Sequence, residues 1–198
     1  MSSEHKPVAR KRLSRDERRR QLLDVAWRLV REEGTEALSL GRLAEQAGVT
    51  KPVVYDHFQT RTGLLVALYQ EYDARQTAML ERALAGCAAD LADRAWVIAE
   101  AYVDCVATQG REIPGVSAAL AASPEMEALK RGYDGPFMDK CRQALAPFAA
   151  AGEIGVAGLW GVVGAADALS LAAACGELEV EAAKRELQAI IVAMVLRQ

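Results

Sequence analysis

The sequence predicts an all-α protein, with an N-terminal three-helix helix-turn-helix unit followed by a larger helical domain. Apolar residues recur at three- and four-residue steps through most of the 198 residues, which is the helical period. The alternation expected for strands is scarce. Capping side chains and glycines separate the periodic runs, so helix starts and ends can be placed one by one.

Composition and charge narrow the class of protein. Apolar residues make up 52% of the chain and charged residues 26%, which excludes a disordered chain. Residues 1–62 carry 13 Lys and Arg against 9 Asp and Glu, whereas residues 63–198 carry 11 against 18. A basic first part before an acidic remainder indicates that the first part contacts a polyanion.

The cysteines and the apolar runs favour a soluble, reduced protein. The four cysteines form no C-x-x-C pair and have no nearby histidine, so we expect mostly buried thiols instead of a disulfide frame or zinc site. The N-terminus has no secretory pattern, and we expect a cytoplasmic protein. The most apolar run, 154–176, contains Asp167, which would cost about 2.5–3.5 kcal/mol at a bilayer centre. We therefore expect it to be a buried helix.

Two helices are predicted before residue 48. Ser14 and Glu17 have the spacing of a capping box, and Gly34 is placed to end the helix that they begin. A second helix is expected to start at Ser39 and to end at Gly48, which can adopt the left-handed conformation.

A third helix follows almost at once. Thr50 can cap it, and Lys51 and Pro52 fall in its first turn, where proline's missing N–H has no cost. Two short helices joined by about three residues that include a glycine form the helix-turn-helix pattern.

The third helix has two distinct faces at about 100° per residue. Val54 and Phe58 fall together and are expected to dock it, while Tyr55 and His57 flank the opposite face. A helix in a major groove has phosphates along both flanks and base edges beneath its N-terminal end. We therefore expect Tyr55 and His57 to donate hydrogen bonds to phosphates. The alternative is that both are half-buried packing residues.

The order of these features resembles the DNA-binding domain of TetR-type transcriptional regulators. The resemblance rests on a capped helix ending in glycine, the segment GTEALSLGRLAEQAGVTKPVVYDHF, then a polar cap and RTGLL. It covers about residues 14–66. It implies a DNA-binding domain over residues 14–62 and a ligand-binding and dimerisation domain over residues 63–198.

The resemblance also implies roles for individual residues. Phosphate contacts are implied at Ser39, Arg42, Tyr55, His57 and Arg61. Base or backbone contacts are implied at Thr50, Lys51, Pro52 and Val53. Asp56 departs from the family's usual aromatic or basic residue. It either accepts a hydrogen bond from a cytosine or, as we favour, lies too far from the DNA to matter.

Two further segments near the DNA-binding helices leave alternatives open. Residues 1–13 form a basic arm, which together with Arg15 enters the minor groove or remains a solvated tail; we favour contact with DNA. Gly63 is expected to weaken the fourth helix by about 1 kcal/mol relative to alanine.

The second domain is expected to contain six helices, with a kink or break near Tyr133–Phe137 caused by Pro136. The helix ranges are 61–85, 89–109, 115–122, 124–150, 154–175 and 179–196. The resemblance implies that residues 154–175 and 179–196 of two copies form a four-helix dimer interface. The alternative is that both are core helices of a monomer.

A ligand pocket is expected between these helices. Its candidate residues are Trp96, Tyr102, Cys105, Phe137, Cys141 and Trp160, although aromatics at helical spacing are more often core. Such a lining favours a small apolar or amphipathic effector. No catalytic set, metal cluster or cofactor motif is visible, so we expect no enzyme.

The function implied by the resemblance is a ligand-responsive transcriptional regulator, a repressor that binds a palindromic DNA operator as a homodimer. The alternative is a DNA-binding regulator that a partner protein controls, with no small-molecule effector.

Overall fold

The computed structural model describes residues 13–87, 90–109, 112–121 and 124–198, and each regular element within them is a helix. The predicted all-α class is confirmed. The arm residues 1–12 lie outside the described residues. The elements are α1 (Arg15–Glu33), η1 (Thr35–Ala37), α2 (Leu40–Ala47), α3 (Lys51–Phe58), α4 (Arg61–Ala85), α5 (Leu91–Gln109), α6 (Glu112–Leu120), α7 (Pro124–Leu145), η2 (Ala146–Phe148), α8 (Val156–Ala174) and α9 (Val180–Val195).

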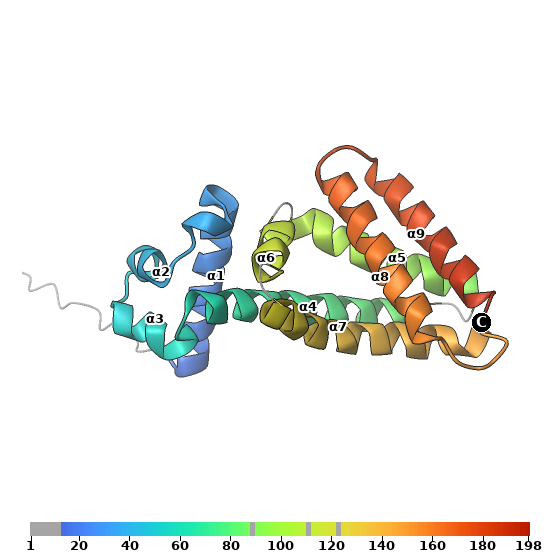
Figure 1. The fold of residues 1–198 in the computed structure, drawn as a ribbon, viewed down its shortest axis with the longest axis horizontal. Helices are drawn as coiled ribbons and strands as arrows, with labels where there is room; N and C mark the ends of the chain where they lie inside the picture. The colour runs from blue at the N-terminus through green and yellow to red at the C-terminus, as the bar shows by residue number, and fades with distance from the viewer. Residues whose placement is uncertain (1–12, 88–89, 110–111, 122–123) are drawn as a thin grey trace, which may run out of the picture.

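Helices α1 to α3 form a small unit at one end of the molecule (Figure 1). The capping box predicted at the start of α1 is confirmed, since the Ser14 amide donates to Glu17 Oε2 at 2.7 Å and the Glu17 amide to Ser14 Oγ at 3.2 Å. Gly48 ends α2 in the left-handed conformation, with φ 63°. Leu22, Leu43 and Val54 close the core that the three helices share. The short turn thereby fixes the direction of α3.

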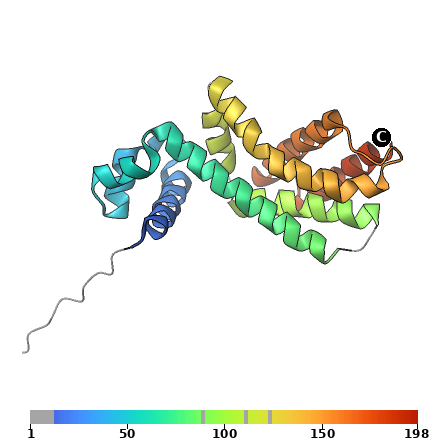
Figure 2. The same ribbon diagram turned by 90° about the horizontal axis from the view of Figure 1, so that it is seen from below.

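Helix α4 joins this unit to the rest of the molecule. It runs for 25 residues from the end of α3 into the larger domain, where it packs on α5, α6 and α7 (Figures 1 and 2). A Cβ atom at Gly63 would lie 2.2 Å from the carbonyl oxygen of Phe58. The low helix propensity of Gly63 is thus accompanied by a steric gain, because only glycine lets α4 start this close to α3.

Helix α6 makes a second connection between the two parts. The Arg31 guanidinium on α1 forms an ion pair with Glu112 on α6. A Cβ atom at Gly115 would lie 2.6 Å from the Thr35 hydroxyl oxygen, so α6 also approaches η1 closely. Nearby, the Trp27 indole donates to Glu71 of α4 at 2.9 Å. The three-helix unit is therefore held against both α4 and α6.

The larger domain is built around α5, which packs against α4, α7, α8 and α9. Of the kink or break expected near Tyr133–Phe137, the break is wrong, since α7 continues through Pro136 as one helix and ends at Leu145. Its predicted end at residue 150 was too late, because η2 follows instead.

Helix α8 departs from the burial expected of its sequence. Its length and composition would allow α8 to cross a membrane, yet it packs on α5 and α9. Only 28% of its most apolar stretch is buried. The expectation of a buried helix is therefore wrong for the single chain. Helices α8 and α9 are an outermost pair, and nothing in the described part of the chain covers their outer face (Figure 1).

Candidate nucleic-acid interface and ligand cavity

Helix α3 divides into a docking face and an outward face, as its sequence predicts. Val54 is fully buried and Phe58 is 4% exposed, so these two side chains hold α3 against α1 and α2. Tyr55 is 51% exposed. His57 is half-buried at the edge of the same outward surface. The hydroxyl of Tyr55 is therefore free to reach a partner outside the chain.

The N-terminal end of α3 is also open. Lys51 and Pro52 are exposed and Val53 is half-buried. Thr50 occupies the N-cap position, but its side chain makes no capping hydrogen bond, contrary to our expectation. Proline in the first turn already fixes the helical backbone there. The Thr50 hydroxyl is consequently available beside the positive end of the helix dipole, which favours an anion.

Ser39 and the two flanking arginines have partners within the chain. Ser39 Oγ accepts the Arg42 amide at 3.1 Å, which leaves its own hydroxyl proton to donate. The Arg42 guanidinium lies 2.8 Å from Glu33 and 3.0 Å from Glu45, and hydrogen bonding to Glu33 is the main cause that raises its pKa. A phosphate would have to compete with these carboxylates for Arg42.

Arg61 ties α4 to the segment between α1 and α2. Its Nε donates to the Leu38 carbonyl at 2.9 Å and its Nη2 to the Thr35 carbonyl at 2.8 Å. Arg61 thereby satisfies two carbonyls that follow the end of α1, which is a structural role that our sequence reasoning missed.

The first turns of α1 add a basic surface next to α3. Burial lowers the pKa of His57, and the positive charges of Arg15 and Arg19 lower it further. The Arg19 guanidinium lies 5.5 Å from the centre of the Phe58 ring. Arg15 belongs to α1 and not to the arm. The three- and four-residue spacing of Arg15, Arg18 and Arg19 is the signal that could have identified this surface.

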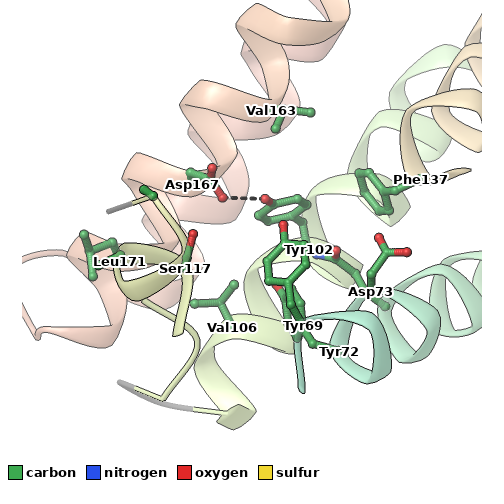
Figure 3. A pocket seen from close by; sticks show the side chains of 13 residues that line it. Tyr69, Tyr72, Asp73, Tyr102, Val106, Ser117, Phe137, Val163, Asp167 and Leu171 are labelled. Carbon is green, nitrogen blue, oxygen red and sulfur yellow. Dashed lines mark hydrogen bonds between the residues drawn. The ribbon is translucent and has the colours of Figure 1, made fainter. Parts of the chain in front are cut away.

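A cavity of about 300 Å³ lies among helices α4, α5, α6, α7 and α8 (Figure 3). Tyr102 stands in its wall and donates its hydroxyl to Asp167 Oδ1 at 2.6 Å. The rings of Tyr102 and Phe137 meet edge to face, with centroids 5.4 Å apart. Burial raises the pKa of Tyr102 well above its usual value, and Asp167 adds to the effect, so the phenol remains a hydrogen-bond donor.

The structure brings two of the six expected ligand residues, Tyr102 and Phe137, to this cavity. Cys141 lines a second, much smaller apolar cavity next to it, and burial raises the pKa of its thiol to about 12. Three expected residues line neither cavity: Trp96 is half-buried on α5, Cys105 is buried, and Trp160 is 41% exposed on α8.

The cavity also contains polar residues that our sequence reasoning missed. Asp73 and Gln76 come from α4, and Asp167 comes from α8. Asp167 is the single charge in the apolar run 154–176, and that position is the signal that could have identified it. Within the described residues, no group of three or more His, Cys, Asp or Glu side chains is arranged to hold a metal ion.

A helix-turn-helix with an outward basic face, joined by one long helix to a domain with a cavity, is an arrangement typical of DNA-binding regulators. Residues 22–68 match the model of the family described as bacterial regulatory proteins, tetR family. The chain is 43% identical over 61 residues to the HTH-type transcriptional activator FasR of Mycolicibacterium smegmatis. That match covers 31% of this chain and 28% of the relative.

Two solved structures share the fold along most of the chain. The transcriptional regulator FadR from Bacillus subtilis, in complex with stearoyl-CoA, has a TM-score of 0.74 at 16% identity and covers 89% of this chain and 98% of its own. The fatty acid degradation regulator FadR from Bacillus halodurans has a TM-score of 0.75 at 14% identity, with coverages of 92% and 97%. The resemblance to TetR-type regulators is confirmed for the first part of the chain, where residues 22–68 match the family model, and the solved structures show that the fold is shared.

Proposed function

We propose that the protein is a homodimeric, effector-responsive regulator that reads a palindromic operator with two copies of α3 in successive major grooves. The observation that carries the proposal is the division of α3 into a buried pair, Val54 and Phe58, and an exposed flank with Tyr55. A helix docked by one face and open on the other is what groove insertion requires. Operator binding also implies a cytoplasmic protein.

In this proposal the contacts divide into two kinds. Tyr55, His57 and Ser39 donate to phosphates along the flanks of α3 and at the start of α2. The residues at the start of α3 lie over base edges, namely Thr50, Lys51, Pro52 and Val53. Arg42 contacts a phosphate after giving up its ion pairs with Glu33 and Glu45. Arg61 acts mainly by holding α4 in place.

Replacing Tyr55 by phenylalanine tests this assignment. Loss of one hydrogen bond to a charged phosphate is expected to cost about 1.5 kcal/mol, or roughly tenfold in operator affinity. Because Tyr55 is exposed, the thermal unfolding of the variant is expected to match that of the wild type. Unchanged affinity, measured by fluorescence anisotropy on the protein's selected DNA, would remove Tyr55 from the interface.

The outer face of α8 and α9 supports a dimer. Val156, Trp160 and Leu171 of α8 and Leu196 after α9 are four of the five large apolar side chains that the described residues expose. Large apolar side chains exposed on one pair of helices are typical of an association site. A second copy of the same pair of helices would cover it and provide the twofold symmetry that a palindromic site needs.

Gly164 offers a sharp test of this dimer. It lies on α8, and an added Cβ atom there meets nothing within 4 Å in the single chain. Gly164→Arg is therefore expected to leave the fold intact but to give monomers in analytical ultracentrifugation. Ala74→Arg, on an exposed position of α4, is the control and is expected to remain dimeric. A dimeric Gly164→Arg protein would exclude this interface.

The cavity favours a small-molecule effector over control by a partner protein. Its wall includes Ser117 and Ala118 of α6, and the same helix carries Glu112, which is paired with Arg31 of the three-helix unit. An effector that moves α6 or α4 would change the distance between the two copies of α3. Half-sites lie about 34–36 Å apart, so a shift of a few ångströms would break contacts on one side. We expect repression that the effector relieves.

A further inference from the structure

The cavity carries negative charge where an acyl-CoA binder would need positive charge. Among its described lining residues the charged side chains are Asp73 and Asp167, and none is lysine or arginine. Asp167 is the one charged residue of α8, in an otherwise apolar sequence. Figure 3 shows the two aspartates on either side of Tyr102. A ligand carboxylate or phosphate placed here would be repelled, whereas a cation would be attracted.

The aromatic lining points to the same ligand charge. Tyr69 and Tyr72 of α4 meet with ring centroids 6.0 Å apart, and Tyr102 contacts Phe137 in the wall of the cavity. Ring faces attract cations, and quaternary ammonium groups in particular are held by several aromatic rings with a nearby carboxylate. Tyr102 remains protonated and donates to Asp167, so it orients this carboxylate without neutralising its charge.

A second, independent observation indicates that the cavity is a ligand site. Gln76 lines it and is only 4% exposed, yet its Nε2 has no hydrogen-bond partner among the described residues. A buried amide N–H without a partner is costly, and a ligand with a hydrogen-bond acceptor that reaches Gln76 would remove the cost. The cavity is therefore lined by a residue with an unpaired donor as well as by two carboxylates.

We propose that the effector is an amphipathic organic cation, with an apolar or aromatic body against the tyrosines and its positive charge near Asp167. This inference rests on the proposed function, since it takes the cavity as the effector site. It separates this chain from the Bacillus subtilis regulator that was solved with stearoyl-CoA. A cavity of about 300 Å³ also suits a small ring system, not a long acyl chain with its nucleotide.

The test compares two fluorescent ligands of similar size and opposite charge. Isothermal titration calorimetry of the purified protein would use trimethyl(2-naphthyl)ammonium and 2-naphthoate at about 0.15 M salt, where exposed charges are largely screened. The cation is expected to bind at least about tenfold more tightly than the anion, because it gains both the carboxylate and the ring contacts. This comparison uses the wild-type protein and does not depend on the folding of any variant.

A pair of charge-neutralising variants tests whether Asp167 causes the preference for the cation. Asp167→Asn keeps an acceptor for the Tyr102 hydroxyl and is expected to lose most of the preference for the cation. Glu177→Gln removes the same charge at an exposed position after α8 and is expected to keep the preference. Equal binding of the two naphthalenes, tighter binding of naphthoate, no binding of either, or a preference that persists in Asp167→Asn would each overturn the inference. None of these results depends on DNA, so the proposed operator binding is judged separately.

Discussion

Arg31 of α1 and Glu112 of α6 form an ion pair that joins the DNA-binding unit to the helix that lines the cavity. Arg31 Nη2 lies 3.3 Å from Glu112 Oε2, and Nε bonds the other carboxylate oxygen, so the pair is bidentate. The Glu112 side chain is 8% exposed, whereas that of Arg31 is 64% exposed. Hydrogen bonding to Glu112 raises the pKa of Arg31. A buried carboxylate thus depends on a cation from the other part of the molecule.

Removing the positive charge of Arg31 should lower the stability of the folded protein. In Arg31→Ala the Glu112 carboxylate remains buried without its partner, and we expect a loss of about 1–3 kcal/mol in the free energy of unfolding. Glu112→Gln should lose less, and the two changes together should be less than additive. Urea unfolding of the three variants measures the coupling, and Arg28→Ala, exposed on the same helix, is the control. Additive effects would show that the pair contributes nothing.

Gly63 is expected to be irreplaceable for DNA binding. Alanine would gain about 1 kcal/mol of helix propensity, but its Cβ would collide with the Phe58 carbonyl, which is backbone and cannot rotate away. We expect Gly63→Ala to lose about 1–3 kcal/mol of stability and to bind the operator more weakly, since α3 must move relative to α4. Gly86→Ala, where the added atom meets nothing, should be neutral. A Gly63→Ala protein as stable as the wild type would disprove the close approach.

Lys51 is expected to contact the DNA directly. If it contacts a phosphate, Lys51→Ala should weaken binding to all sequences and lower the slope of log affinity against log salt by about one. If it reads a base, the loss should instead be confined to the preferred sequence. Binding titrations at several salt concentrations distinguish the two, with Lys140→Ala of α7 as the control. A variant with wild-type affinity and slope would place Lys51 away from the DNA.

The pKa of His57 predicts how operator affinity varies with pH. In the free protein it is lowered by burial and by the charges of Arg15 and Arg19, so the neutral imidazole is favoured. Phosphates would offset the arginine charges and favour the imidazolium, so the pKa should rise on binding. Affinity should then increase as the pH falls from about 8 to about 6.

The comparison with His57→Gln isolates this effect. The variant can still donate a hydrogen bond but does not titrate, so its pH dependence should be flatter than that of the wild type. The folding stability of the unbound protein should depend on pH in the opposite direction to operator affinity. A lowered pKa in the folded state means that the unfolded chain takes up the proton first, and stability should fall as the pH drops through about 6.5. Identical pH profiles for the two proteins would rule out protonation of His57 on binding.

The sequence predicted the parts of the fold that local signals determine. Helix starts at Ser14 and Ser39 and the turn at Gly48 follow from capping chemistry and backbone conformation, and each is present. The faces of α3 follow from the helical period, with Val54 buried and Tyr55 exposed. These features need no knowledge of the tertiary structure.

Contacts between distant segments could not be predicted in this way. The pairing of Arg31 with Glu112 and of Tyr102 with Asp167 joins residues 81 and 65 positions apart, and nothing in the local pattern specifies them. For the same reason residue type alone does not select the aromatic side chains that line the cavity, and Trp96 and Trp160 lie outside it. Asp167 stands out in the sequence as a lone charge in an apolar helix. Its place in the cavity, however, depends on neighbouring residues of α4 and α5 that only the fold brings there.

Selection of DNA fragments by the purified protein, followed by sequencing, tests the central claim most directly. A twofold reader that uses α3 should enrich an inverted repeat whose half-sites are centred about one helical turn, roughly 10 base pairs, or a multiple of it apart. The same selection with Tyr55→Phe should recover the repeat more weakly. Absence of any enriched sequence, or enrichment of a single unrepeated site, would contradict a twofold reader that uses α3.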